Sequence, residues 1–369
     1  MSHLLKDLYS PDFYQNFLNA FQKVSPKVDR EAFLSSIFDE QWEQRELKDR
    51  MRHTTKTMHQ WMPTHFKKAV ALMKKLLKVL ENEGIQETSV EYMFLPDYLE
   101  LYGLEHCKTS LAAMEWLTPF TSCEFAIRPF IVRYPEILIP QILAWTTHSD
   151  LHLRRLASEG CRPRLPWAMA LPELKKDPSP ILPILAQLKN DPSEYVRKSV
   201  ANNLNDISKD HPELVLRIGR EWKGRSKATD WIIKHACRTL LKAGNKTAMQ
   251  LFGYSPTDQL QVHQFDLQAK EVRIGETLNF SFQMTNSAPQ EALLRIEYGI
   301  DYLRANGSLS RKVFKITERK LAAGARLKME RKQSFRIITT KTFYPGRHQL
   351  ALIVNGEEMG CLSFELLPK

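Results

Sequence analysis

The spacing of the hydrophobic residues changes once along this 369-residue chain, near residue 255. Before that point apolar residues recur every three or four positions. The apolar residues among 66–80 fall on one stripe, which is typical of an amphipathic helix. After it they alternate with polar residues, as in 278–284, and Gly-containing turn signals separate the runs. The sequence therefore predicts a multidomain protein, with an all-α domain over 1–255 and a small all-β sandwich over 256–369.

Three segments of the helical part share a pattern in which two apolar residues stand four positions apart. The apolar pairs are Leu153/Ala157, Val196/Val200 and Ile232/Ala236. The copies recur at intervals close to the ~40-residue period of HEAT-type helical repeats. We therefore expect a helical repeat solenoid in which these pairs face the stack, so that the polar positions of the same helices share one outer surface.

That predicted outer surface is mainly basic. Its repeated positions are Arg155/Glu159, Lys198/Asn202 and Lys234/Arg238, and one further turn adds Asp206 and Lys242. With the neighbouring cations, the candidate DNA-binding residues are Arg128, Arg154, Arg155, Arg162, Arg164, Arg197, Lys198, Lys234, Arg238 and Lys242. A curved basic surface can follow a duplex backbone and release its counterions, although an ordinary solvated helix face has the same composition.

The composition supports a polyanionic partner. The chain has 53 Lys and Arg against 42 Asp and Glu, which gives a net charge of +11. At 43% hydrophobic residues it has enough apolar material to form folded cores. Nucleic acid is the first partner to consider and an anionic membrane surface the second.

Several classes of protein are disfavoured by missing patterns. The five cysteines lie far apart and are odd in number, which suggests neither a disulfide framework nor a CxxC metal site and fits the cytoplasm. No apolar stretch has the length of a signal-peptide core or of a membrane span. The few glycines form no P-loop or Rossmann pattern, so no nucleotide cofactor is expected.

Neither a metal site nor a covalent mechanism is indicated. His148 and His152 stand four apart, as helical zinc ligands would, but the intervening Ser149 and Asp150 are typical of a helix start. No lysine has a clear case for a depressed pKa, so a Schiff-base lyase step is not expected.

Three segments resemble the AlkC family of bacterial alkylpurine DNA glycosylases: residues 124–130, 153–167 and 199–212. The resemblance covers essentially the whole chain. It implies HEAT-like repeats followed by an immunoglobulin-like domain that helps the repeats encircle DNA. It also implies excision of cationic N-alkylated bases, such as 3-methyladenine and 3-methylcytosine, from double-stranded DNA without base flipping or a cofactor, by a protein that we expect to be a monomer.

The resemblance assigns functional carboxylates to Glu124, Glu159 and Asp206, and the aromatic residue at the lesion to Trp167. Such carboxylates would stabilise an oxocarbenium-like sugar and orient water, while an indole would attract the cationic base. Which carboxylate activates water stays open.

Each of the four residues also has a simpler interpretation. Glu159 could form an i,i+4 ion pair with Arg155, and Asp206 could be a helix-end acid. Glu124 could be a first-turn acid and Trp167 a packing residue. The rival hypothesis is accordingly a non-catalytic repeat protein that binds DNA or acts as a protein scaffold.

Overall fold

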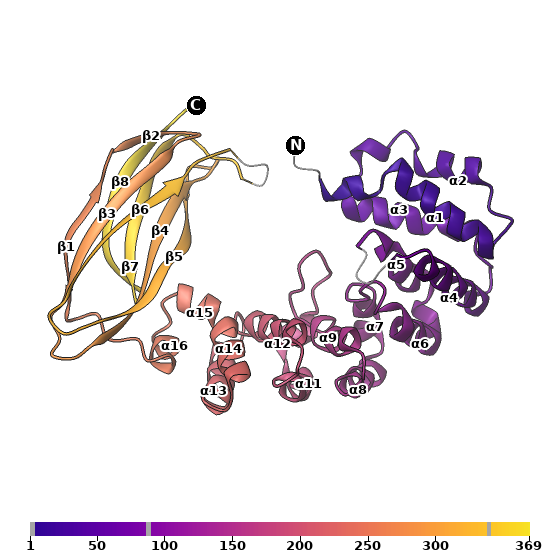
Figure 1. Cartoon of the computed structure of the whole chain (residues 1–369), viewed down its shortest axis with the longest axis horizontal. Helices are drawn as coiled ribbons and strands as arrows, with labels where there is room; N and C mark the ends of the chain where they lie inside the picture. The colour runs from indigo at the N-terminus through magenta and orange to yellow at the C-terminus, as the bar shows by residue number, and fades with distance from the viewer. Residues whose placement is uncertain (1–3, 86–89, 338–340) are drawn as a thin grey trace. The chain divides into compact units, whose positions relative to one another are not determined.

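The computed structural model describes residues 4–85, 90–337 and 341–369. The described residues form sixteen α-helices, short 3-10 helices and eight strands, drawn in chain order in Figure 1. Within this described part, no helix has both the length and the apolar character needed to cross a membrane. The change from helix to strand falls between Leu251 and Leu260, so the predicted order of an all-α part and an all-β part is confirmed.

The helices of the N-terminal half include the one predicted over 66–80, which spans 66–82 as α4. Their bounds are α1 (Pro11–Val24), α2 (Arg30–Ile37), α3 (Leu47–His59), α4 (Phe66–Asn82), α5 (Phe94–Tyr102), α6 (Cys107–Leu117), α7 (Ile127–Arg133) and α8 (Pro135–Trp145). Helix α1 begins where Ser10 accepts a hydrogen bond from the backbone of Phe13 and Pro11 occupies the first turn. Local capping thus sets its start, while the apolar stripe sets its buried face.

The later helices carry the predicted repeats. Their bounds are α9 (Leu151–Glu159), α10 (Pro172–Lys176), α11 (Leu182–Leu188), α12 (Glu194–Ile207), α13 (Pro212–Trp222), α14 (Lys227–Ala236), α15 (Arg238–Lys242) and α16 (Lys246–Leu251). All six residues of the three predicted apolar pairs are fully buried. Helix α9 packs against α8, α11 and α12, as stacked repeats require (Figure 1).

Asp150 caps the start of α9, because its side chain accepts a hydrogen bond from the backbone of His152. His148 therefore precedes the helix, and its Nδ1 accepts a hydrogen bond from the backbone of Asp150. The two histidines do not share a helix face, as predicted from the intervening residues. The third repeat differs from the prediction, because Cys237 interrupts the helix between α14 and α15 and separates Lys234 from Lys242.

The β part is a sandwich of two sheets. Its strands are β1 (Leu260–Leu267), β2 (Glu271–Arg273), β3 (Thr277–Asn286), β4 (Ala292–Leu303), β5 (Leu309–Leu321), β6 (Arg326–Ser334), β7 (Gly346–Val354) and β8 (Glu357–Leu367). One sheet has the order β1-β3-β6 and the other β2-β8-β7-β4-β5, with antiparallel pairing throughout except for the parallel pair β2–β8.

Alternation explains the core of the sandwich. Leu278, Phe280, Phe282 and Met284 of β3 all point inward and are buried, as their period of two predicts. The turn between β7 and β8 is the pair Asn355-Gly356, one of the Gly-containing turn signals of the sequence, and both residues have positive φ, 48° and 82°. These angles match the two-residue hairpin turn that Asn-Gly favours.

The chain divides into two compact units. One comprises Met1–Asp210 and Gly224–Ile232, and the other His211–Lys223 and Ile233–Lys369. The second unit therefore joins α13, α15 and α16 to the sandwich. Within this unit, the segment between α16 and β1 is fixed to β4, since the backbone of Ser255 donates to the Leu293 carbonyl at 3.1 Å. The secondary structure changes near residue 255, but the boundary between the compact units lies earlier in the chain. The two differ because the last helices pack with the strands.

Candidate functional site

The three predicted carboxylates come from neighbouring elements of the first unit. Glu124 lies in the loop between α6 and α7, Glu159 is the last residue of α9, and Asp206 is the penultimate residue of α12. Because α9 packs against α12, their C-terminal ends meet and bring Glu159 near Asp206. The structure therefore collects residues that are widely separated in the sequence.

Two arginines join these carboxylates into one continuous network. Arg162 places Nη1 2.6 Å from Glu159 Oε1 and Nε 2.9 Å from Asp206 Oδ2, and all three side chains are buried. Arg155 pairs with Glu124 and lies 3.6 Å from Glu159. We call Glu124, Arg155, Glu159, Arg162 and Asp206 the acid–arginine cluster. In it every acid has a cationic partner, and the three carboxylates outnumber the two guanidiniums by one, so the cluster keeps a net negative charge.

Both arginines of the cluster remain charged. Burial acts to lower the pKa of Arg155, but the charges of Glu124 and Glu159 outweigh it and raise the pKa. Burial likewise acts to lower the pKa of Arg162, but the charges and hydrogen bonds of Glu159 and Asp206 outweigh it and raise the pKa. The predicted i,i+4 pair of Arg155 with Glu159 is thus present, as one contact of a larger network.

Trp167 is presented to solvent by the loop that follows α9. Its side chain is 64% exposed and its φ is +63°, a left-handed conformation that a bulky residue rarely adopts. The alternative of a packing residue is therefore wrong for Trp167. An exposed indole on a strained backbone is typical of a binding site rather than of a core.

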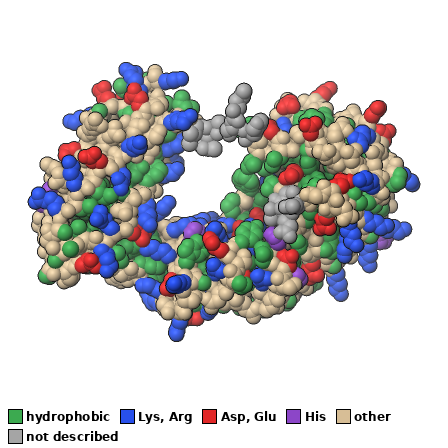
Figure 2. All heavy atoms as spheres, in the orientation of Figure 1, with side chains coloured by type: hydrophobic (Ala, Val, Ile, Leu, Met, Phe, Trp, Pro, Cys, Tyr) green, Lys and Arg blue, Asp and Glu red, His purple; other side chains and the backbone are tan. Residues whose placement is uncertain are grey.

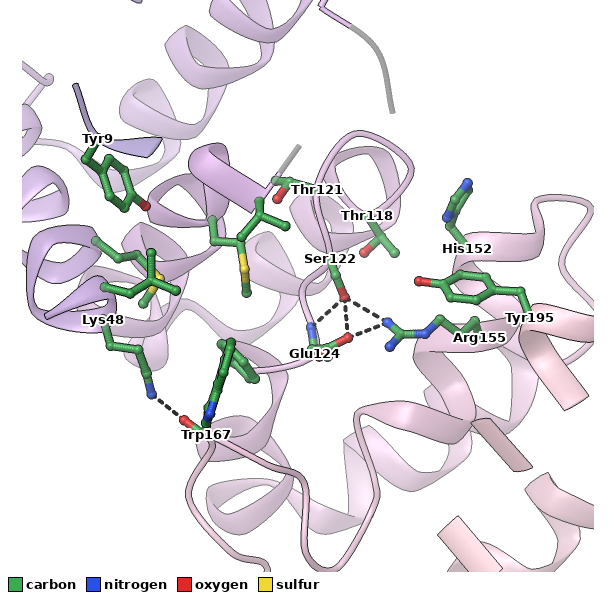
Figure 3. Close-up of a pocket in the computed structure, with 15 residues that line it drawn as sticks. Tyr9, Lys48, Thr118, Thr121, Ser122, Glu124, His152, Arg155, Trp167 and Tyr195 are labelled. Atoms are coloured by element: carbon green, nitrogen blue, oxygen red, sulfur yellow. Dashed lines mark hydrogen bonds and ion pairs between the residues drawn. The ribbon is translucent and has the colours of Figure 1, made fainter. Parts of the chain in front are cut away.

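Glu124 and Trp167 line the same pocket of about 280 Å³, shown in Figure 3. Its walls are largely apolar and aromatic, and its lining residues are Tyr9, Leu47, Lys48, Met51, Val90, Met93, Thr118, Thr121, Ser122, Glu124, Phe125, His152, Arg155, Trp167 and Tyr195. Among the lining residues that the structure describes, Glu124 is the one acid, and Ser122 donates a 2.9 Å hydrogen bond to it. Glu159 and Asp206 lie outside the lining and are more deeply buried than Glu124. A planar cation fits such a pocket, because aromatic faces and a carboxylate both attract positive charge.

Several pocket residues were not predicted from the sequence. Phe125 stands within the segment that resembles a known family, but nothing in its spacing marks it as pocket-lining. Tyr195 stacks over the Arg155 guanidinium at 4.8 Å, and Lys48 reaches the site from α3. Only tertiary packing brings Lys48 there, since it lies far from the recognised segments in the sequence.

Arg128 and Arg162 are corrections to the predicted DNA-binding set. Arg128 is fully buried and donates to the carbonyls of Met169 at 2.7 Å and Gly160 at 2.9 Å. Burial lowers the pKa of Arg128 to about 10. Arg162 is buried between two carboxylates, and Glu159 is buried rather than outward-facing. These arginines fix the site from within and do not present charge to solvent.

The remaining predicted cations occupy varied positions. Arg154 binds Asp191 through two hydrogen bonds, and Arg164 binds Asp210 in the same way. Lys198 is exposed beside Glu194, and Arg197 donates to the carbonyls of Asp191 and Pro192. Arg238 donates to the carbonyl of His235, while Lys242 is exposed. Figure 2 shows Lys and Arg side chains over both the helices and the strands.

Lys234 is a further correction, because it belongs to a polar contact inside the second unit. Its ammonium lies 3.2 Å from Glu318 of β5, hydrogen-bonds to Tyr254, and stands over the Phe252 and Tyr254 rings. Burial lowers the pKa of Lys234, and the charge of Glu318 offsets this only in part. Lys234 therefore joins α14 to the sandwich instead of lying on an open basic surface.

Glu318 makes the stability of the second unit depend on acidity. Burial acts to raise its pKa, but hydrogen bonds from Tyr254 and Lys315 and the charge of Lys234 prevail and lower the pKa to about 2. An unfolded Glu titrates near ~4.3, so this contribution is complete well above that pH and is lost as the pH falls through it towards 2. Glu318→Gln is expected to lower the free energy of unfolding at neutral pH and to reduce the loss of that free energy as the pH falls below about 4. Urea unfolding over a series of pH values measures both effects, with the exposed Glu330→Gln as control. An unchanged loss of stability at acid pH in Glu318→Gln would contradict the assignment.

Comparison with known proteins identifies the architecture. Residues 105–240 match the family described as DNA alkylation repair enzyme, and residues 261–368 match the C-terminal Ig-like domain of YhaZ. The structure of an alkylpurine DNA glycosylase, AlkC from Pseudomonas fluorescens, bound to DNA containing an abasic site analog, superposes with a TM-score of 0.92. It is 37% identical over 99% of both chains. This chain belongs to the AlkC family. The uncharacterized protein YhaZ of Bacillus subtilis (strain 168) is 43% identical over 98% of this chain and 99% of its own.

The AlkC-family assignment confirms the resemblance predicted from three segments of the sequence, together with the helical repeats and the immunoglobulin-like sandwich. All three carboxylates and Trp167 lie within the part that matches the DNA alkylation repair enzymes. The chain is thus an AlkC-type DNA glycosylase in fold and family. Lys48 lies outside that matching part, although it lines the same pocket.

Proposed function

We propose that this protein is a monofunctional DNA glycosylase that hydrolyses the N-glycosidic bond of cationic N-alkylated bases, such as 3-methyladenine and 3-methylcytosine, in duplex DNA. The single observation that carries the proposal is the exposed indole of Trp167 beside the carboxylate of Glu124, in one pocket that adjoins two further acids. A carboxylate with aromatic neighbours favours a cationic substrate over a neutral one.

The chemistry requires little help for the leaving group. An N-alkylated base already carries positive charge, so it departs as a neutral base when the glycosidic electrons move onto it. The difficulty lies in the oxocarbenium-like sugar and in bringing water to its anomeric carbon. Carboxylates fixed beside the sugar stabilise its developing charge, and one of them takes the proton of the attacking water.

The arginines keep the acids in place for this step. Arg162 holds Glu159 and Asp206 at fixed positions, and Arg155 does the same for Glu124. Preorganised charges need no rearrangement during the reaction, which is how such groups lower a barrier. In this proposal Glu124 is the acid that faces the pocket, and the two buried acids strengthen the negative field behind it.

Duplex DNA is the proposed partner. The AlkC structure of similar fold holds DNA, and the net charge of +11 favours a polyanion. Release of counterions from the phosphates makes such binding steeply salt-dependent. Duplex affinity is expected to fall by at least about tenfold between low and physiological salt, as measured by fluorescence anisotropy with an undamaged duplex. A flat salt response would contradict binding through the phosphate backbone.

The deciding experiment measures base release. The protein is incubated in excess with a duplex that carries one 3-methylcytosine or 3-methyladenine, and the free base is quantified by mass spectrometry. We expect free base together with strand breaks that form only after alkali treatment, since no lyase step is proposed. An absence of free base from both lesions would refute the proposed activity.

We further propose that the protein acts as a monomer in the cytoplasm, which size-exclusion chromatography and cell fractionation can test.

One observation favours a second function. All three acids of the cluster are ion-paired, as the alternative of a non-catalytic repeat protein requires. A protein of that kind would bind duplexes with the same salt dependence and release no base. The base-release measurement therefore separates the two functions, whereas affinity alone does not.

A further inference from the structure

Lys48 connects the N-terminal helices to the loop that carries Trp167. It lies in the first turn of α3, and its Nζ donates a 2.6 Å hydrogen bond to the backbone carbonyl of Trp167. Its ammonium also stands over the Phe125 ring at 5.1 Å. Figure 3 shows the lysine side chain pointing at the tryptophan carbonyl beside it. The two residues are 119 positions apart, so this contact exists only in the folded chain.

The loop around Trp167 is held by its own backbone hydrogen bonds, such as that from Ala168 to the Leu165 carbonyl at 3.3 Å, and by contacts from outside it. The indole is exposed, so its burial does not fix the residue, and the φ of +63° is disfavoured for a side chain of this size. Two cations bind carbonyls of the loop from different elements: Lys48 binds residue 167, and Arg128 binds residue 169 at 2.7 Å. Arg128 is rigidly buried, whereas Lys48 is exposed and acts at the tryptophan itself.

We propose that Lys48 is a positioning residue that holds Trp167 in its left-handed conformation and thereby keeps the indole beside the carboxylate pocket. The inference rests on the proposed function in that it assigns the indole to substrate binding. Lys48 acts through the Trp167 carbonyl and through its contact with Phe125, which together fix the two aromatic walls. Helix α3 thus completes a pocket whose acid, Glu124, comes from the loop between α6 and α7.

The first test does not depend on activity. The protein is labelled with 5-fluorotryptophan, and the Trp167 resonance is identified by its loss in Trp167→Phe. Lys48→Met removes the donor while keeping the length of the side chain, and it is expected to shift or broaden the Trp167 resonance and leave the other tryptophan resonances in place. Lys48→Arg, which retains a donor, should restore the signal. Lys56→Met, an exposed lysine further along α3, is the matched control. An unchanged Trp167 resonance in Lys48→Met would overturn the proposal.

The second test is a double-mutant cycle on base release. Lys48→Met is expected to lower kcat about 5- to 10-fold with unchanged duplex affinity, in keeping with the loss of an oriented group. In a Trp167→Ala background the same change should have no further effect, because the positioned side chain is gone. A lysine that bound a phosphate would lower duplex affinity equally in both backgrounds, and that result would refute the positioning role. If the wild-type protein releases no base, the proposed function fails while the resonance of Trp167 still decides the role of Lys48.

Discussion

Asp206→Asn is expected to lower the rate of base release by about 10²–10³-fold, the range found when one charged or hydrogen-bonding group is removed from a preorganised site. The amide has the shape of the carboxylate but no charge, so it weakens the negative field behind the pocket. Duplex affinity should be unchanged or slightly higher, because one negative charge is removed from a protein that is proposed to bind a polyanion. Single-turnover kinetics with a 3-methylcytosine duplex measures the chemical step directly.

Asp191→Asn is the matched control for Asp206→Asn. Both are buried aspartates paired with an arginine in the first unit, but Asp191 precedes α12 and binds Arg154, at the opposite end of the helix from Asp206. Each change weakens the partner of an arginine, which is buried for Arg162 and half-buried for Arg154, and should cost about 1–3 kcal/mol of stability. The two variants should therefore unfold at similar denaturant concentrations while only Asp206→Asn loses base release. Equal losses of activity in both would support the scaffold hypothesis.

Trp167→Ala is expected to lower kcat/KM by about 2- to 30-fold, since a cation–π contact contributes about 0.5–2 kcal/mol. Thermal stability should change little, because most of the indole is in solvent. Trp167→Gly should lose as much activity as Trp167→Ala but be more stable than it by about 1 kcal/mol, since glycine adopts a positive φ without strain. Base-release kinetics and urea unfolding of the two variants test both expectations.

Met169→Ala controls for general disturbance of the loop. Met169 is also exposed, and its backbone carbonyl, which Arg128 binds, survives the substitution. It should retain near wild-type kinetics. If Met169→Ala and Trp167→Ala lose activity equally, the effect belongs to the loop and not to the indole.

The architecture could be predicted because it depends on local patterns. The period of the apolar residues distinguishes helix from strand, and the recurring pairs led by Leu153 and Val196 mark the buried side of each repeat. Cys237 marks where the prediction failed, since nothing in the spacing shows that the helix is interrupted there. The division into compact units also escaped prediction, because it depends on packing between the last helices and the strands.

Candidate site residues could be named from the family resemblance, but the partners of their charges could not be predicted. Family resemblance singled out Glu124, Glu159, Asp206 and Trp167, yet a charge on a helix face has the same appearance in sequence whether it meets water or another side chain.

The sequence thus predicted the fold class, because residue spacing distinguishes helix from strand, and its resembling segments predicted the family and named the candidate acids. The tertiary structure alone decided that Arg128 and Arg162 are internal supports, that Lys234 binds the sandwich, and that Lys48 reaches Trp167. The physical reason is that an ion pair or hydrogen bond depends on distances of a few ångströms between residues far apart in the chain, and only folding sets those distances.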